Sequence, residues 1–196
     1  MSQSVVLFGG SFDPLHLGHL ALAQLAYETL DVSQVIFIPT SQNPLKGSGY
    51  ASAVDRIAMV EEVLIDIPHF SVWPGEVDRK GRSYTFNTLE QITQEFALQK
   101  PYFLMGSDSV ASFHQWYKAK ELLSLMTPAI VQRPGIPCVF DASLGEVEVV
   151  EIPSPHWGIS SSMIREYLAH GLSGTYLLPP SVIRYIEQHK LYGRRV

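Results

Sequence analysis

The feature that most constrains the fold of this chain is a regular alternation of short apolar runs with longer segments of helical spacing. Residues 5–8 form a wholly apolar run that two glycines end, and its length and β-branching predict a strand buried on both faces. Apolar side chains then recur at helical spacing from residue 16 to about residue 30, and a second apolar run follows at residues 35–38. A strand, a helix and a strand in this order predict a right-handed crossover unit.

The same alternation continues to the end of the chain. Further helices are predicted over residues 53–65, 85–97, 161–170 and 180–189, shorter helical stretches near 109–113 and 119–125, and strands over 102–105, 129–131 and 147–152. Such alternation favours an α/β fold, here a single domain over residues 1–196 with a Rossmann-like open, mostly parallel sheet and helices on both faces. Ligands of such sheets bind beyond the carboxyl ends of the strands. The candidate sites are therefore polar clusters that directly follow a predicted strand.

Composition narrows the class of protein. The chain has 196 residues, 46% of them hydrophobic and 17% charged, which is typical of a soluble globular domain. A net charge of −5, from 14 basic and 19 acidic residues, disfavours nucleic-acid binding. The lone cysteine, Cys138, excludes an internal disulfide and a cysteine-built metal site. Because no signal peptide and no apolar stretch of membrane-spanning length is evident, we expect a cytoplasmic protein with no nucleic-acid or membrane partner.

The loop after the first strand, residues 9–19, combines several features of a phosphate site. Its two leading glycines let a ligand approach the backbone, and the helix that follows offers free amides and the positive end of its dipole. His16 and His19 are expected to face the same side of the first helical turn, where two imidazoles can donate to phosphate oxygens. Gly18 between them has no side chain and so lets a phosphate approach. A tight turn, a metal-binding pair and purely structural histidines are the alternatives for these features taken singly.

A second candidate phosphate site lies near the end of the chain. Three serines at residues 160–162 begin an amphipathic helix, and Arg165 lies one turn inside it. Serine is a good N-cap, so capping is one interpretation. The other is that the serines and the helix start bind phosphate together with Arg165, whose guanidinium keeps its charge and matches phosphate geometry. One serine can cap while its neighbours bind, so both interpretations stand.

The sequence of the first loop, G-G-S-F-D-P-L-H-L-G-H, resembles the H-x-G-H signature of the nucleotidyltransferase superfamily, and more narrowly that of bacterial nicotinate-nucleotide adenylyltransferases. Residues 159–165, I-S-S-S-M-I-R, resemble the second signature of that family, and the resemblance covers essentially the whole chain. The resemblance implies that the two signatures bind the phosphates of ATP from opposite sides. The ATP-binding residues that it implies are Gly9, Gly10, Ser11, Phe12, Gly18, Asp108, Ile159, Ser160, Ser161 and Ser162. The catalytic residues that it implies are His16, His19, Lys46 and Arg165.

Four segments resemble the nicotinate-nucleotide branch of the superfamily specifically. They are residues 83–89 (S-Y-T-F-N-T-L), 106–109 (G-S-D-S), 113–116 (F-H-Q-W) and 133–135 (R-P-G). The acceptor-binding residues that they imply are Ser83, Tyr84, Thr85, Gly106, Trp116 and Arg133. An indole is a flat partner for a pyridine ring, and a carboxylate such as that of Asp108 can accept two sugar hydroxyls. Core packing for Trp116 and helix capping for Asp108 are the alternatives.

One departure from the family pattern falls at residues 43–46, which read N-P-L-K where the family usually has P-P-H-K. Lys46 remains available as a phosphate cation, but Leu45 replaces the imidazole, and Asn43 or His69 are the substitutes that the chain offers. The resemblance implies that the 5′-phosphate of the acceptor attacks the α-phosphorus of ATP in line, with catalysis by positioning and charge stabilisation. Mg²⁺ is expected on the ATP phosphates, without a dedicated metal site in the protein.

Three other hypotheses compete with adenylyl transfer to nicotinate mononucleotide. The nearest is a different acceptor, nicotinamide mononucleotide or phosphopantetheine. The second is a nucleotide-binding regulatory protein without activity, motivated by Leu45. The third, a fragment of a class I aminoacyl-tRNA synthetase, is disfavoured because the chain is too short and too acidic for tRNA and has no second, lysine-rich signature loop. The sequence leaves the oligomeric state open, a homo-oligomer included.

Overall fold

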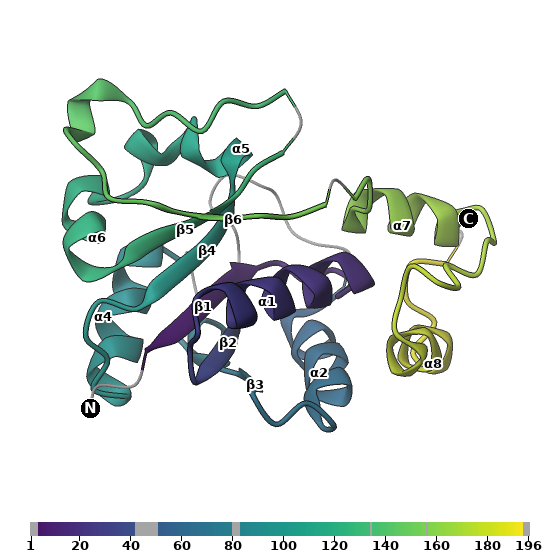
Figure 1. The fold of residues 1–196 in the computed structure, drawn as a ribbon. Helices are drawn as coiled ribbons and strands as arrows, with labels where there is room; N and C mark the ends of the chain where they lie inside the picture. The colour runs from purple at the N-terminus through teal and green to yellow at the C-terminus, as the bar shows by residue number, and fades with distance from the viewer. Residues whose placement is uncertain (1–3, 42–50, 80–82, 134, 156, 194–196) are drawn as a thin grey trace. The chain divides into compact units, whose positions relative to one another are not determined.

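Six parallel strands form one sheet in a computed structural model that describes residues 4–41, 51–79, 83–133, 135–155 and 157–193 (Figure 1). The strands are β1 (Val5–Gly10), β2 (Gln34–Pro39), β3 (Phe70–Val72), β4 (Tyr102–Gly106), β5 (Thr127–Val131) and β6 (Val150–Ile152), in the spatial order β3-β2-β1-β4-β5-β6. The order changes direction between β1 and β4, which are parallel neighbours with Val6 opposite Tyr102. The loops that follow these two strands therefore start at the switch point where open α/β sheets bind ligands.

Within the described ranges, eight α-helices and two short 3-10 turns accompany the strands, and the last two helices follow the final strand. The helices and turns are α1 (Leu17–Thr29), α2 (Ala53–Leu64), α3 (Gly75–Asp78), α4 (Thr85–Glu95), α5 (Ser107–Val110), η1 (Phe113–Gln115), α6 (Ala119–Leu125), η2 (Ala142–Leu144), α7 (Ser161–Ala169) and α8 (Pro180–Gln188). Local sequence explains where some begin: Ser52 and Asp55 form a capping box at the start of α2, and α8 starts with a proline where no N–H is needed. None of the helices in these ranges is long and apolar enough to cross a membrane.

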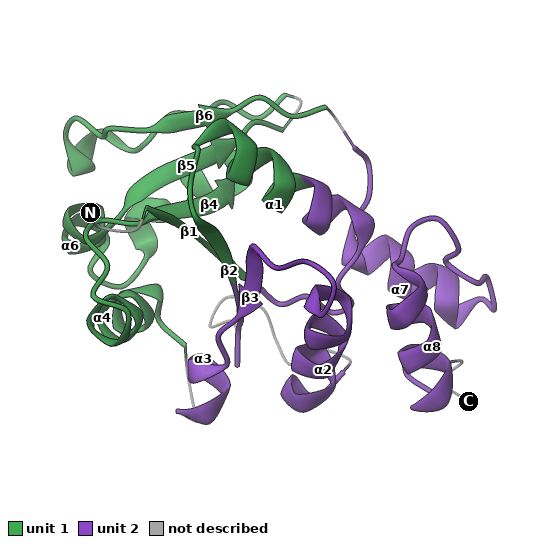
Figure 2. Cartoon of the chain, turned by 60° about the horizontal axis from the view of Figure 1, so that its bottom comes forward, with its two compact units in different colours: residues 1–9, 22–36, 83–156 green, residues 10–21, 37–82, 157–196 purple. Residues whose placement is uncertain are grey.

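The chain divides into two compact units (Figure 2). The first comprises residues 1–9, 22–36 and 83–156, and it contains β4 to β6 with the helices α4 to α6. The second comprises residues 10–21, 37–82 and 157–196, and it contains β3 with α2, α3, α7 and α8. Each unit draws on three separate segments, so no single cut in the sequence separates them.

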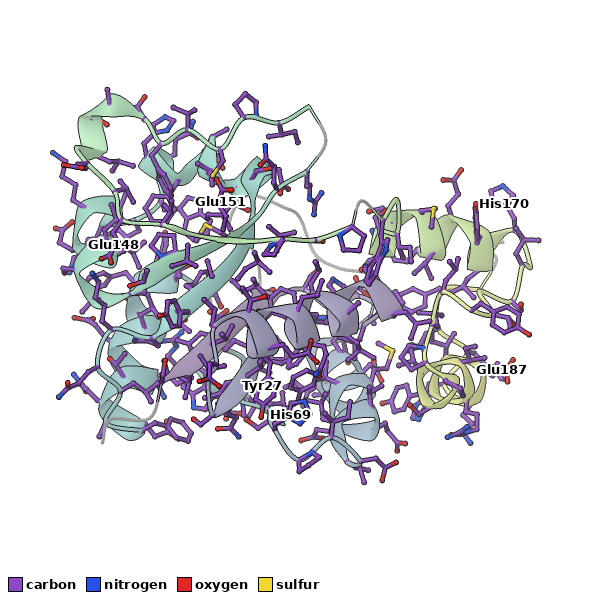
Figure 3. The ribbon with its side chains drawn as sticks, in the orientation of Figure 1. Tyr27, His69, Glu148, Glu151, His170 and Glu187 are labelled. Atoms are coloured by element: carbon purple, nitrogen blue, oxygen red, sulfur yellow. The ribbon has the colours of Figure 1, made fainter. Side chains whose placement is uncertain are left out.

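Each unit has a core of its own. In the first unit the strands supply it, with Leu104, Ala129 and Ile130 almost wholly buried. At the surface of this unit Glu148, labelled in Figure 3, forms an ion pair of 3.1 Å with Lys100. The core of the second unit joins α2, α7 and α8, and its buried members are Ala51, Met59, Ile164, Leu178, Val182 and Ile186. This second core fixes the helix that carries the three serines against the helix that follows residues 42–50.

The predicted α/β class and parallel sheet are confirmed. The predicted helices and strands are present, with ends that shift by a few residues. Three elements were not predicted: the three-residue strand β3, the four-residue helix α3 and the 3-10 turn η2. The helical stretch predicted near residues 109–113 was wrong in detail, because α5 occupies residues 107–110 and a separate turn occupies 113–115.

Candidate active site

The loop that follows β1 has an unusual backbone at Phe12. Phe12 has a φ of 46° although it is not glycine, and its side chain is fully buried. Its ring lies edge-on to His19, with centroids 5.1 Å apart, and 5.5 Å from the ring of Phe37. A Cβ on Gly10 would lie 2.9 Å from this ring, so the second glycine of the loop is required by the packing of Phe12. A backbone held in this region costs roughly 1–3 kcal/mol and persists only where its surroundings fix it.

His16 and His19 form a reciprocal pair at the start of α1. Their rings stack with centroids 3.6 Å apart and planes within 18° of parallel, so the prediction that they share one side of the turn is confirmed. The N–H of His16 donates to Nδ1 of His19 at 3.2 Å, and the N–H of His19 donates to Nδ1 of His16 at 3.3 Å. Because each Nδ1 accepts, a neutral ring carries its proton on Nε2. Both imidazoles are thereby fixed as Nε2–H donors.

Gly18 lies against the ring of His16. A Cβ at this position would lie 3.0 Å from Nδ1 and 3.1 Å from Cε1 of His16, and 3.7 Å from Cβ of Ile159. His16 itself is only 5% exposed. Gly18 therefore leaves room for the imidazole of His16, which is a more specific requirement than the access for phosphate expected from the sequence.

The second signature is attached to the first through side-chain donors to backbone carbonyls. Ser160 caps α7, since the N–H of Met163 donates to its Oγ at 3.2 Å. The hydroxyl of Ser161 donates to the carbonyl of Pro14 at 3.0 Å. Arg165 donates from Nη1 to the carbonyl of Asp13 at 2.6 Å and from Nη2 to Oγ of Ser162 at 3.0 Å. The capping interpretation is therefore confirmed for Ser160, while Ser161 and Arg165 hold the loop after β1.

Asp13 is a buried residue of this loop that sequence reasoning missed. Its carboxylate, 2% exposed as a residue, accepts hydrogen bonds at Oδ1 from the N–H of Ala51 at 3.2 Å and from the hydroxyl of Tyr192 at 2.5 Å. Burial and the bond to Asp13 raise the pKa of Tyr192. Tyr192, near the end of the chain, therefore supports the loop after β1 through its hydroxyl.

Arg56 on α2 is the other residue that was missed. Its Nη1 donates to the carbonyl of Ser11 at 2.6 Å, and its Nη2 donates to the carbonyls of Thr40 at 2.6 Å and Ser41 at 3.2 Å. Burial lowers the pKa of the guanidinium, and the charge of Asp13 opposes this shift. A signal was present in the sequence, since Arg56 falls in the apolar stripe of α2 together with Met59, Val60 and Leu64.

The acceptor-binding candidates lie in the first unit, where aromatic rings gather after β4. Trp116 is half-buried, with its ring centroid 5.0 Å from that of Phe113 and 6.4 Å from that of Phe103. Phe113 is fully buried and also contacts Phe140 edge-on at 5.3 Å. The indole is therefore supported by core rings but is not itself a core residue. In the same unit a Cβ on Gly9 would lie 3.1 Å from Phe103, so this glycine accommodates an aromatic ring of β4.

Asp108, Arg133 and Gly106 lie together at the carboxyl ends of β4 and β5. Nε of Arg133 lies 3.3 Å from Oδ1 of Asp108, and the N–H of Arg133 donates to Oγ of Ser107 at 2.9 Å. A Cβ on Gly106 would lie 2.3 Å from Oδ1 of Asp108, so a larger residue at this position would displace the carboxylate from this ion pair. No side-chain cap is present at α5, and the capping interpretation of Asp108 was wrong.

The remaining acceptor candidates lie at the start of α4. Ser83 is buried, Tyr84 precedes the helix, and Thr85 is its first residue. The ring of Tyr84 lies 5.0 Å from that of Tyr117, which is the neighbour of Trp116 in sequence. This aromatic contact brings the segments 83–85 and 116–117 together, as the resemblance implies.

Two predicted contributors to phosphate binding are not placed at this site. Lys46, with Leu45 and Asn43, lies outside the described residues. His69 lies at the amino end of β3, edge-on to Phe70 at 4.6 Å (Figure 3), whereas the loop residue Thr40 follows the carboxyl end of β2. His69 therefore does not substitute for the missing imidazole. Among the described residues no group of three or more His, Cys, Asp or Glu side chains could hold a metal ion.

Comparison with known proteins decides the family. Residues 7–167 match the family model described as Cytidylyltransferase-like. The chain is 40% identical over 195 residues to a protein of Herpetosiphon aurantiacus named "Probable nicotinate-nucleotide adenylyltransferase", covering 97% of this chain and 98% of the relative. The chain belongs to the nicotinate-nucleotide adenylyltransferase family. A member of the same name from Lactiplantibacillus plantarum is 36% identical over 97% of this chain and 88% of its own.

Solved structures with this fold include members of the nicotinate-nucleotide adenylyltransferase family. The structure of the Plasmodium falciparum nicotinic acid mononucleotide adenylyltransferase complexed with NaAD has a TM-score of 0.74, with 19% identity over 97% of each chain. The complex of the same enzyme with APC has a TM-score of 0.73, with 18% identity over 97% of each chain. At this level of identity the likeness shows the fold. The family model ends at residue 167, so Tyr192 lies beyond the part that it matches.

Proposed function

We propose that this protein transfers the adenylyl group of Mg-ATP to nicotinate mononucleotide, giving deamido-NAD and pyrophosphate. The observation that carries the proposal is the stacked pair of His16 and His19, 3.6 Å apart, whose Nδ1 atoms are both occupied by backbone N–H donors. Two Nε2–H donors fixed on one turn suit the charge that builds on phosphoryl oxygens during nucleotidyl transfer. The family of the chain supports the choice of acceptor.

The reaction needs positioning more than activation, because the 5′-phosphate of the acceptor is already an anion. It attacks the α-phosphorus of ATP, the bond to the bridging oxygen breaks, and pyrophosphate leaves. We assign His16, His19 and Arg165 to the phosphoryl oxygens, with Lys46 as a fourth cation on the basis of sequence alone. Backbone and hydroxyl contacts to ATP are assigned to Gly9, Gly10, Ser11, Phe12, Gly18, Ile159, Ser160, Ser161 and Ser162. Mg²⁺ enters with the nucleotide as Mg-ATP, since phosphates are its usual main ligands.

The acceptor is assigned to the aromatic cluster of the first unit. The half-buried indole of Trp116, backed by Phe113, offers a flat face to a pyridine ring. Arg133, which pairs with Asp108 at 3.3 Å, suits the acceptor phosphate, while Asp108 suits ribose hydroxyls of ATP. Ser83, Tyr84, Thr85 and Gly106 complete the assignment.

The test is turnover with three acceptors. Purified protein is incubated with Mg-ATP and either nicotinate mononucleotide, nicotinamide mononucleotide or phosphopantetheine, and pyrophosphate and product are followed. Strong preference for nicotinate mononucleotide supports the proposal. Turnover with phosphopantetheine alone would keep the phosphate assignments and reject those of Trp116 and Thr85. Binding of ATP without turnover on any acceptor would reject the proposal and favour a regulatory protein, with Leu45 as the residue to restore to histidine.

A further inference from the structure

We propose that Arg56 is a positioning residue for adenylyl transfer, a role that rests on the function proposed above. Its guanidinium joins two segments of chain by donating to the carbonyl of Ser11 in the loop after β1 and to that of Thr40 in the loop after β2, each at 2.6 Å. The side chain is 4% exposed and lies on α2, outside both signatures. It therefore acts on the loop from behind and is not expected to touch a substrate.

A buried cation at this position needs a reason. The stripe of α2 that contains Arg56 is otherwise apolar, with Met59 and Val60 fully buried one turn further on. Burying a charge carries a large desolvation cost, so packing of the α2 stripe alone does not explain an arginine here. What an arginine adds is a planar fork that binds two carbonyls in fixed directions, which neither methionine nor lysine can do.

The carbonyl that Arg56 holds controls the most strained residue of the loop. Because the peptide unit is planar, fixing the carbonyl of Ser11 also fixes the direction of the N–H of Phe12. Phe12 has the positive φ of 46°, and the carbonyl of the next residue, Asp13, is held by Arg165 at 2.6 Å. Two arginines from different helices thus hold the carbonyls of the residues before and after Phe12.

Holding Phe12 also holds the histidine pair. The ring of Phe12 lies edge-on to that of His19 at 5.1 Å, and His19 stacks on His16. A change in the Ser11–Phe12 peptide is therefore transmitted to the imidazoles through packed rings. Misplacement of reacting groups by about 1 Å can cost 10²-fold in rate. Arg56 should accordingly affect kcat and ATP binding, while leaving KM for the acceptor unchanged.

The kinetic test compares Arg56→Lys and Arg56→Ala with the wild type. We expect Arg56→Lys to lower kcat by about 10²-fold, because one ammonium cannot span both carbonyls. Guanidinium added at millimolar concentration should restore part of the activity of Arg56→Ala, whereas urea, which has a similar shape but no charge, should not. All constants are divided by the folded fraction from a denaturant titration, so that loss of folding is not counted as loss of positioning.

Two matched controls separate positioning from stability. Met59→Ala lies on the same helix and opens a cavity in the core that α2 shares with α7 and α8, and Arg184→Ala removes an exposed arginine from α8. Both should keep the kinetic constants of the wild type per folded molecule. The proposal is overturned if Arg56→Lys keeps kcat within about twofold of the wild type, or if Met59→Ala loses kcat as strongly as Arg56→Lys at equal stability.

Hydrogen exchange tests the same role without any reaction. In Arg56→Lys the amide of Phe12 and its neighbours in the loop should exchange faster than in the wild type, while the amides of α8 exchange at the same rate. If the wild type turns over no acceptor, the proposed function fails, and this exchange pattern with the Kd for ATP still tests Arg56. Unchanged loop exchange together with an unchanged Kd for ATP would overturn the inference.

Discussion

His16 and His19 each cap the other, because the backbone N–H of either residue donates to Nδ1 of its partner, at 3.2 and 3.3 Å. This is the pattern of a capping box in which imidazoles replace the usual serine and glutamate. The two nitrogens of each ring thus have separate tasks. Nδ1 accepts a hydrogen bond from a backbone N–H at the start of α1, and Nε2–H can donate a hydrogen bond to a phosphate oxygen.

Substitutions of His19 should separate these two tasks. His19→Asn retains an acceptor near the position of Nδ1, so its free energy of unfolding should stay close to that of the wild type, while kcat falls by about 10²–10³-fold. His19→Gln retains a donor near Nε2 but loses the cap, so it should keep more activity and lose about 1 kcal/mol of stability. Urea titrations and steady-state kinetics measure both quantities. A fully active His19→Asn would remove Nε2 from the mechanism.

Gly18→Ala should lower activity without unfolding the protein. The added Cβ would press on Nδ1 and Cε1 of His16 at 3.0 and 3.1 Å, so the imidazole must shift. Alanine is favoured over glycine in a helix by about 1 kcal/mol, which offsets part of the steric cost. We therefore expect a fall in kcat with little change in Tm. The control is Ala21→Gly, which changes the helix propensity of the same helix in the opposite direction. Gly171→Ala would not serve, because Gly171 has a φ of +80°, where alanine is strained.

Helices and strands long enough to show a repeating apolar pattern can be predicted from the sequence, whereas elements of three or four residues cannot. β3 has three residues, and only Phe70 of these is buried, so it shows no alternation. α3 has four residues and begins with Gly75, whose presence follows from Trp73, since a Cβ there would lie 2.2 Å from the indole. Such a requirement comes from packing and leaves no local helical signal. The same holds for residues 107–115, where two short turns replace the one predicted.

Trp116→Ala should weaken binding of the acceptor. Loss of a stacking face for an aromatic base costs about 1–3 kcal/mol, which is roughly 5- to 150-fold in KM for nicotinate mononucleotide. KM for ATP should change little, and Trp116→Phe should recover part of the loss. Phe96→Ala, which removes an aromatic side chain that is 47% exposed at the end of α4, is the control. Equal KM values for Trp116→Ala and the wild type would return Trp116 to a packing role.

Tyr192→Phe should destabilise the protein in a way that depends on pH. Near pH 7 the variant loses the hydroxyl donor to the buried carboxylate of Asp13, at a cost of about 1–3 kcal/mol. The pKa of Tyr192 is raised in the folded protein, so above about pH 10 the unfolded chain loses a proton that the folded chain keeps. The stability of the wild type therefore falls with pH in that range, and its advantage over the variant shrinks.

Urea titrations at a series of pH values from 7 to about 11 would measure this difference. Tyr176→Phe, in which the altered side chain is 88% exposed, should match the wild type throughout. A difference between Tyr192→Phe and the wild type that stays constant or grows above pH 10 would contradict the assignment of the buried hydroxyl.

The sequence motifs contain the residues that are assigned to phosphate, but they do not contain Arg56 and Tyr192, which hold the loop after β1 from other parts of the chain. Both histidines, Ser160 to Ser162 and Arg165 stand in recognisable motifs. Arg56 and Tyr192 contact the loop from 45 and 179 residues away, and no local pattern links partners at that distance. For Arg56 the sequence contains one signal, a charged residue inside the apolar stripe of α2. For Tyr192 it contains no signal, because the sequence does not distinguish a tyrosine that only packs from one whose hydroxyl donates a hydrogen bond.

The bond between Asp13 and Tyr192 also has a consequence during synthesis on the ribosome. At about 5–20 residues per second, the 179 residues that separate them take roughly 10 to 40 s to be translated. For nearly all of that interval the nascent chain carries both histidines and the two glycines, but Tyr192, whose hydroxyl donates to Asp13, has not been made. The loop after β1 is thus made well before the residue that completes its hydrogen bonding.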